Sequence, residues 1–213
     1  MQTILLADIP AQLWRNGAGL TRPIASGLAS IAGRATTRVP AGTVPHLDAF
    51  DWRISLADIK GDGPFSAFPG IDRCAVLLGD SGITGITLSG PSGSSHLRPL
   101  QPLSFPGEAE LEARCEPGLT LTRPRILNLM VRRNTMRSEV SVIDAAHRCP
   151  AAATVFVLIA AGCWEFVAPD QTTTTLSVGQ AGLIHALAEG AIVRPARSST
   201  HGKAVLVILQ QAT

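Results

Sequence analysis

Arginines and small polar side chains recur in one stretch of the sequence, residues 50–73. From Asp51 to Ala57 polar and apolar residues alternate with a period of two, which is typical of a β-strand with two different faces. Arg53 and Ser55 share one of these faces, and Arg73 adds a second guanidinium. Because a guanidinium fork matches the two oxygens of a carboxylate, the stretch predicts a binding site for a small anion.

Two further segments supply candidate walls for this site. Residues 14–21 form a glycine-broken loop with an indole, an amide and a hydroxyl, and residues 127–133 alternate again, with Asn128, Met130 and Arg132 on one face. Which face of the strand from Asp51 to Ala57 lines the pocket is not fixed by parity. The predicted ligand-binding residues are Trp14, Asn16, Gly17, Gly19, Thr21, Arg53, Ser55, Ser66, Phe68, Arg73, Asn128, Met130 and Arg132.

Each of these features also has a purely structural interpretation. Trp52, Phe65 and Phe68 are equally expected in a core, and Asp51 or Asp72 beside an arginine is typical of a structural ion pair. Asn-Gly is foremost a turn dipeptide, and basic residues at the end of a strand often face solvent.

Composition favours an all-β protein. Of 213 residues 46% are hydrophobic and 16% charged, and 20 glycines with 15 prolines indicate short strands joined by turns. The net charge of +2 is scattered, so neither a nucleic acid nor a membrane is expected as a partner. The N-terminus lacks a basic signal region, and the longest apolar stretch, residues 151–164, is too short to span a bilayer. We therefore expect a cytoplasmic protein.

Two similar runs of short strands predict two fused β-barrel lobes, at about residues 1–140 and 141–213. The N-terminal segment is a candidate to add strands to the second lobe. Residues 89–99, rich in serine and glycine, are predicted as a surface loop, and residues 134–140 as the link between the halves.

No metal or other cofactor is predicted. The histidines, His46, His96, His147, His185 and His201, never pair at the spacing of metal ligands. The four cysteines, Cys74, Cys115, Cys149 and Cys163, form no C-x-x-C and are expected as free thiols. The sequence also contains neither G-x-S-x-G nor H-E-x-x-H.

Four motifs together resemble the HutD/Ves family. They are W-R-N-G-A-G-L-T at residues 14–21, F-D-W-R-I-S-L-A at 50–57, G-P-F-S-A-F-P-G-I-D-R at 63–73 and L-N-L-M-V-R-R at 127–133. The resemblance implies a bacterial bicupin of two jelly-roll barrels, with few or no long helices and without the cupin metal ligands. It also implies a role in histidine utilisation, in which the protein binds N-formylglutamate and limits flux without catalysis.

The chain departs from the family pattern at three positions. Ala18 replaces the middle glycine of N-G-G-G, Pro23 stands where a Glu commonly follows the threonine, and Ile126 where an Asp commonly precedes L-N-L-M. The loss of two carboxylates removes negative charge near the predicted arginines, so the ligand is open to change.

The first functional hypothesis is a non-catalytic bicupin that binds a small carboxylate such as N-formylglutamate. The alternative is a metal-independent isomerase or hydrolase of a small organic acid, with Asp72 or Asp51 as general base. A partner-binding protein would instead expose a large apolar patch. A homodimer is left open.

Overall fold

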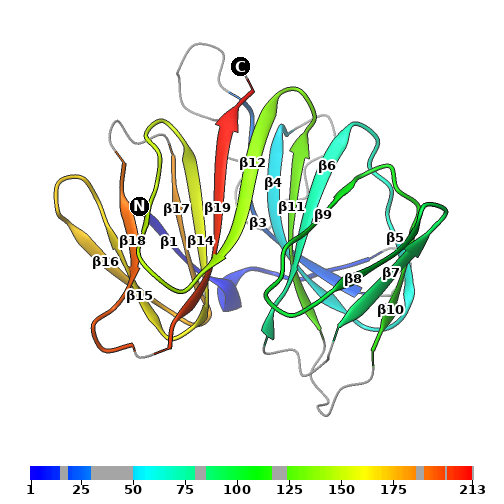
Figure 1. Cartoon of the computed structure of the whole chain (residues 1–213), viewed down its shortest axis with the longest axis horizontal. Coiled ribbons are helices and arrows are strands. Elements are labelled where there is room, and N and C mark those ends of the chain that lie inside the picture. Colours follow the sequence, from blue (N-terminus) through cyan, green and yellow to red (C-terminus); the bar gives the residue numbers. More distant parts are fainter. Residues whose placement is uncertain are drawn as a thin grey trace. The chain divides into compact units, whose positions relative to one another are not determined.

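The structure is a computed structural model, and it describes residues 1–14, 19–29, 50–79, 85–116, 124–185, 190–199 and 201–212. In these ranges the chain forms β-strands in four sheets and one 3-10 helix, η1 (Leu6–Asp8) (Figure 1). The named strands pair antiparallel, as expected when short strands follow one another through tight turns. The prediction of an all-β protein is confirmed.

The chain divides into two compact units. The terminal unit contains Met1–Asp8 and the chain from Met136 onward, and the middle unit contains Ile9–Ala29 and, as far as described, residues 50–135. The chain thus begins in one unit, builds the other, and returns to the first at residue 136. The sequence pattern places this change near residue 140.

The middle unit has one sheet of six strands and one of four. The six-stranded sheet has the order β2 (Gln12–Leu13), β3 (Gly19–Gly27), β4 (Trp52–Ile59), β11 (Arg125–Arg132), β6 (Ile71–Leu77) and β9 (Leu103–Pro106). The four-stranded sheet has the order β5 (Gly63–Phe65), β10 (Leu111–Cys115), β7 (Ile86–Gly90) and β8 (Gly93–Leu97). Both sheets contribute to one core, whose buried members are Ala57, Ile59, Phe65, Ala75, Leu77, Ile86, Leu88, Leu97, Ala113 and Ile126.

The terminal unit repeats this plan with five and four strands. Its larger sheet has the order β1 (Gln2–Leu5), β17 (Gln180–Ile184), β14 (Thr154–Ala161), β19 (Lys203–Gln211) and β12 (Met136–Ile143). The smaller has the order β13 (His147–Arg148), β18 (Ile192–Pro195), β15 (Cys163–Val167) and β16 (Thr173–Ser177). The core between them is filled by Cys149, Ala153, Val155, Val157, Ile159, Trp164, Phe166, Leu176, Ile184, Ala191, Val193, Ala204, Leu206 and Ile208.

Two segments differ from the sequence-based prediction. Residues 89–99, predicted as a loop, contain β8, which pairs with β7 from Ile86↔Leu97 to Gly90↔Gly93. Residues 134–140, predicted as a link, contain the start of β12, which pairs with β19 along its whole length. Both strands are largely exposed, so backbone pairing holds them in place while their side chains lack the apolar alternation that marks a strand in sequence.

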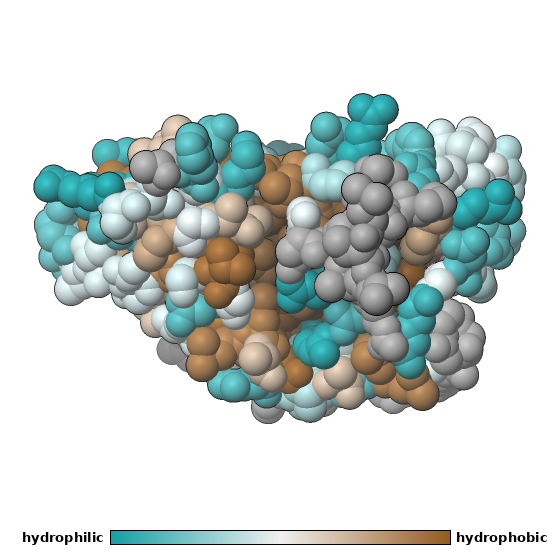
Figure 2. All heavy atoms as spheres, turned by 90° about the horizontal axis from the view of Figure 1, so that it is seen from below, coloured by the Kyte–Doolittle hydropathy of each residue, from teal (hydrophilic) through white to brown (hydrophobic). Residues whose placement is uncertain are grey.

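Some large apolar side chains are exposed at the surface. Figure 2 shows hydrophobic residues among hydrophilic ones on one face of the molecule. The large exposed hydrophobic residues of the described chain are Met1, Leu5, Leu13, Leu28 and Val178. No helix within the described ranges is long and apolar enough to cross a bilayer.

Candidate functional site

A cavity of about 490 Å³ opens in the middle unit. Its walls come from β2, β3, β4, β5, β6 and β11 and from the residues that follow β2 and β5. The lining residues are Gln12, Leu13, Trp14, Thr21, Arg53, Ser55, Ala57, Ile59, Phe65, Ser66, Phe68, Arg73, Asn128 and Met130.

Strand register brings the two central arginines into one row. Met130 of β11 is the partner of Arg53 on β4 and of Arg73 on β6, so the three residues lie side by side across three strands. Two residues before Met130 on β11, Asn128 lies opposite Ser55 of β4. Side chains alternate across a strand, and the polar face of β4 is therefore the one that lines the cavity.

The opposite face of β4 anchors the strand. Trp52, Ile54 and Leu56 are at most 1% exposed, and they alternate with the lining residues. The alternation in the sequence did not decide which face of β4 lines the cavity. In the structure the apolar face packs outside the cavity.

Arg73 is held by both polar and aromatic neighbours. Its Nη1 donates to the carbonyl oxygen of Ser66 at 3.0 Å, and its Nη2 donates to Oδ1 of Asn128 at 3.3 Å. The guanidinium carbon also lies 5.0–5.3 Å from the ring centres of Phe65, Phe68 and Phe105, within the range of cation–π attraction. These contacts orient the guanidinium, and none of them neutralises its positive charge.

Neither buried arginine has a carboxylate partner among the described residues. Arg53 and Arg73 are 8% and 7% exposed, and the Nε atom of each is buried without a hydrogen-bond partner there. Burial lowers the pKa of Arg53, and burial together with the charge of Arg53 lowers the pKa of Arg73 to about 10. Both groups stay protonated at neutral pH, so the cavity carries two positive charges that no described acid neutralises.

The carboxylates of the neighbouring strands serve other arginines. Asp58 on β4 pairs with Arg22, and Asp51 accepts a hydrogen bond from Nε of Arg132 at 3.0 Å. Neither acid lines the cavity. The positive charge of the site therefore results from where each acid points, although the chain contains nearly as many acids as bases.

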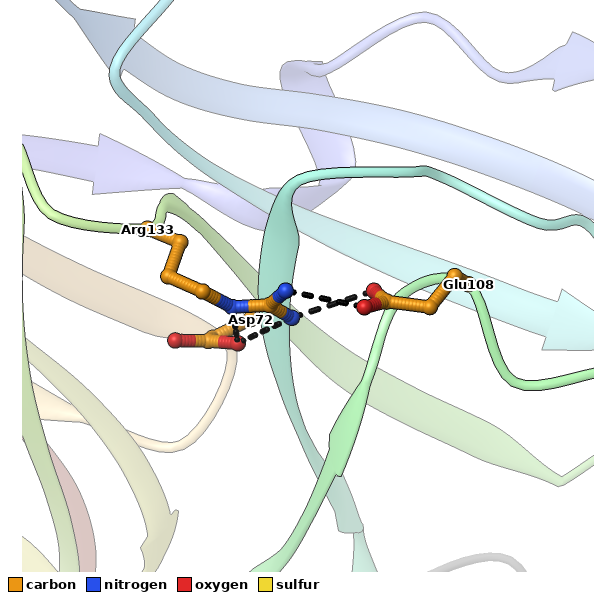
Figure 3. Close-up of polar contacts among 3 residues, drawn as sticks. All are labelled: Asp72, Glu108 and Arg133. Carbon is orange, nitrogen blue, oxygen red and sulfur yellow. Dashed lines mark hydrogen bonds and ion pairs between the residues drawn. The ribbon is translucent and has the colours of Figure 1, made fainter.

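Arg133 shows the contrasting arrangement (Figure 3). Its Nε donates to Asp72 at 2.8 Å, and its two terminal nitrogens donate to both oxygens of Glu108 at 2.8 and 3.0 Å. These hydrogen bonds, to Glu108 first and then to Asp72, raise the pKa of Arg133. Asp72 is outside the cavity lining, as is Asp51, so neither is placed to act there as a general base.

Trp14 and Thr21 form a second polar element of the wall. The indole Nε1 of Trp14 donates to Oγ1 of Thr21 at 2.7 Å. Gly19 lies behind this pair, because a Cβ atom there would come within 2.9 Å of the Trp14 ring and of the carbonyl oxygen of Asp58. Gly19 thus serves close packing and does not line the cavity.

Nine of the predicted ligand-binding residues meet in the cavity, whereas Gly19 and Arg132 do not line it. The nine are Trp14, Thr21, Arg53, Ser55, Ser66, Phe68, Arg73, Asn128 and Met130. Arg132 was expected beside Met130, but its guanidinium turns to Asp51 and to the carbonyl oxygen of Phe50. Asn16 and Gly17 lie outside the described residues, as does Ala18.

Five lining residues were missed: Gln12, Leu13, Ala57, Ile59 and Phe65. The alternation through Arg53 and Ser55 continues to Ala57 and Ile59 and could have found both. Gln12 and Leu13 carry no such signal, since they reach the cavity only because β2 pairs with β3.

The described lining does not fit the metal that many cupin barrels hold. It contains no His, Cys, Asp or Glu. Elsewhere in the described chain, no group of three or more such residues is arranged to bind a metal.

The sequence matches the family model described as HutD over residues 6–201. The chain belongs to the HutD family. A protein named Ves from Cronobacter sakazakii is 33% identical over 167 residues, which cover 78% of this chain and 79% of that protein. The resemblance stated from the four sequence motifs is confirmed.

Solved structures support the same fold. HutD from Pseudomonas fluorescens superposes with a TM-score of 0.73 at 24% identity, covering 100% of this chain and 99% of that one. A cupin 2 conserved barrel domain protein from Leptotrichia buccalis reaches a TM-score of 0.54 at 9% identity, covering 98% and 95%. The predicted bicupin fold is confirmed.

Proposed function

We propose that this HutD-family protein is a non-catalytic bicupin that binds a small carboxylate, such as N-formylglutamate, in the cavity of the middle unit. The observation that carries the proposal is the pair of buried arginines, Arg53 and Arg73, without a carboxylate partner among the described residues. An unpaired buried charge is costly in a folded protein. A ligand carboxylate would neutralise that charge and satisfy the open donors.

The cavity also suits the rest of such a ligand. Ser55 and Asn128 offer hydrogen bonds beside the arginines, and Trp14, Phe68 and Met130 provide apolar surface. Hydrogen bonds to charged groups contribute about 1.5–3 kcal/mol each, so two arginine contacts supply about 3–6 kcal/mol of the roughly 8 kcal/mol that micromolar affinity requires, and the other contacts of the cavity supply the rest.

Family membership supports the metabolic side of the proposal. Binding of an intermediate of histidine utilisation, or of a related pathway in the cytoplasm, would limit flux without any catalytic step. The isomerase or hydrolase alternative depended on Asp51 or Asp72 acting as a base, and neither lines the cavity.

Calorimetric titration with N-formyl-L-glutamate tests this function. We expect saturable micromolar binding that is unaffected by a chelator and lost in Arg53→Ala. The matched control is Arg133→Ala, which removes the same charge from the same unit but from a side chain that faces Asp72 and Glu108. Affinity within about threefold of the wild type in Arg53→Ala would contradict the role of Arg53 as an anchor.

A further inference from the structure

We infer that the cavity selects acids that lack a free amino group, so that it takes acylated or deaminated dicarboxylates and rejects the corresponding free amino acid. The inference rests on the proposed function and concerns the same cavity. It follows from the charges of the described wall, which contains two guanidinium groups and no carboxylate.

The charged groups of the described wall are donors only. Arg53 and Arg73 present guanidinium groups, which have no acceptor. The Oδ1 atom of Asn128 accepts from Arg73, which occupies one of its two lone pairs. In the same way the carbonyl oxygen of Ser66 is engaged by Arg73.

Thr21 follows the same pattern. Its Oγ1 accepts from the indole of Trp14, so one lone pair and the hydroxyl proton remain for a ligand. These three contacts each occupy one acceptor lone pair of the wall. A ligand that consists of acceptors can bind both guanidiniums, whereas a ligand ammonium finds only neutral acceptors in the described lining, such as the hydroxyls of Ser55 and Ser66.

Two departures from the family pattern lie next to the described wall. Ile126 is fully buried next to Ala57 in the register of β4 and β11, on the same side of β11 as Asn128 and Met130. Pro23 is buried on β3 opposite Ser55. These are the positions where the family resemblance leads one to expect Asp and Glu. Here isoleucine and proline stand at these positions, paired with the lining residues Ala57 and Ser55.

The charges of the wall also disfavour a ligand with a free amino group. An ammonium brought into the cavity loses its water and meets two guanidinium charges, with no described carboxylate in the lining to offset them. The α-carboxylate of a free amino acid carries such an ammonium on the adjacent carbon. An acyl group on that nitrogen removes the charge and adds a carbonyl acceptor.

Three ligands with the same carbon chain test the inference by calorimetry: glutarate, N-formyl-L-glutamate and L-glutamate. We expect the first two to bind and L-glutamate to bind at least 30-fold more weakly than the formyl compound. L-glutamate binding within threefold of the formyl compound would overturn the selectivity and leave the proposed function intact. Absence of binding by all three would overturn both.

A single carboxylate added to the wall should reverse the preference. Asn128→Asp gives Arg73 a partner and the ligand an acceptor, so we expect the ratio of formyl-glutamate to glutamate affinity to fall at least tenfold. Ser66→Asp, at an exposed lining position, provides a second variant that does not disturb the core. The control is Ser138→Asp, an exposed residue of β12 outside the lining, where the ratio should not change. An unchanged ratio in both lining variants would overturn the inference.

Discussion

Strands β4 and β14 are both third in the order of the larger sheet of their unit, but their inward-facing side chains differ in polarity. On β4 the inward positions include Arg53 and Ser55, and they border a cavity. On β14 the corresponding alternation, Val155, Val157 and Ile159, is packed in a continuous apolar core. Of the buried polar and charged side chains in the described chain, only Thr154 belongs to the terminal unit, whereas Ser26, Arg53, Ser55, Asp58, Arg73 and Asn128 belong to the middle unit.

This difference separates stability from function. The terminal unit gains free energy from apolar burial, at roughly 25 cal/mol per Å². The middle unit gives up part of that gain by burying two unpaired guanidiniums around a space large enough for a ligand. One fold plan therefore yields a filled barrel and a binding barrel, depending on the inward residues of a few central strands.

The largest expected effect comes from placing an arginine in the filled unit. Val157→Arg buries a charge without a partner or a cavity, so we expect the free energy of unfolding to fall by about 3–5 kcal/mol. Urea denaturation measures the change. Thr175→Arg, at an exposed position of the same unit, should stay within about 0.5 kcal/mol of the wild type. A loss below about 1 kcal/mol for Val157→Arg would show that the terminal unit tolerates charge as the middle unit does.

The second effect is a pH dependence that belongs to the middle unit alone. Because the pKa of Arg73 is lowered to about 10, its guanidinium is protonated below that pH and loses its proton above it. Carboxylate affinity should be constant from about pH 6 to about pH 9 and fall up to tenfold per unit above about pH 10. In Arg73→Lys the fall should begin at lower pH, since lysine starts from a pKa of about 10.4 and meets the same burial. The same profile in both proteins would argue against Arg73 as the titrating group.

A smaller effect is a gain of stability on removing a charge. Arg53 has no hydrogen bond to a described residue, so Arg53→Met should raise the free energy of unfolding by about 1 kcal/mol while abolishing anion binding. Arg73→Met should gain less, because it also loses the contacts to Ser66 and Asn128. Thermal and urea unfolding of both variants compare them, and a marked destabilisation of Arg53→Met would mean that its charge supports the fold.

The smallest expected effect is the coupling between Arg73 and one of its rings. Phe105 lies 5.0 Å from the guanidinium and edge-on to Phe65 at 6.3 Å. A double-mutant cycle of Phe105→Leu and Arg73→Met should give a coupling free energy of about 0.5–1 kcal/mol. A value near zero would leave the hydrogen bonds to Ser66 and Asn128 as the contacts that orient the guanidinium.

The sequence predicted strands correctly where polar and apolar side chains alternate. The period of two around Arg53 and around Asn128 found both central strands and four residues of the cavity lining, Arg53, Ser55, Asn128 and Met130. It failed for β8 and the start of β12, whose exposed side chains carry no apolar face and whose position depends on the backbone of β7 and β19. Arg132 was misplaced for a related reason, since alternation gives the face of a residue but not the acid that its long side chain reaches.

The sequence by itself determined the strand-rich architecture, the family and the identity of the polar residues on each central strand. These follow from turn residues, two-residue periodicity and short motifs, all of which are local. Only the tertiary structure decided that Arg53, Met130 and Arg73 form one row, and that Asp51, Asp58 and Asp72 point to other arginines. The pairing register of distant strands and the direction of each side chain set the charge of the cavity, and neither is encoded in any single stretch of the chain.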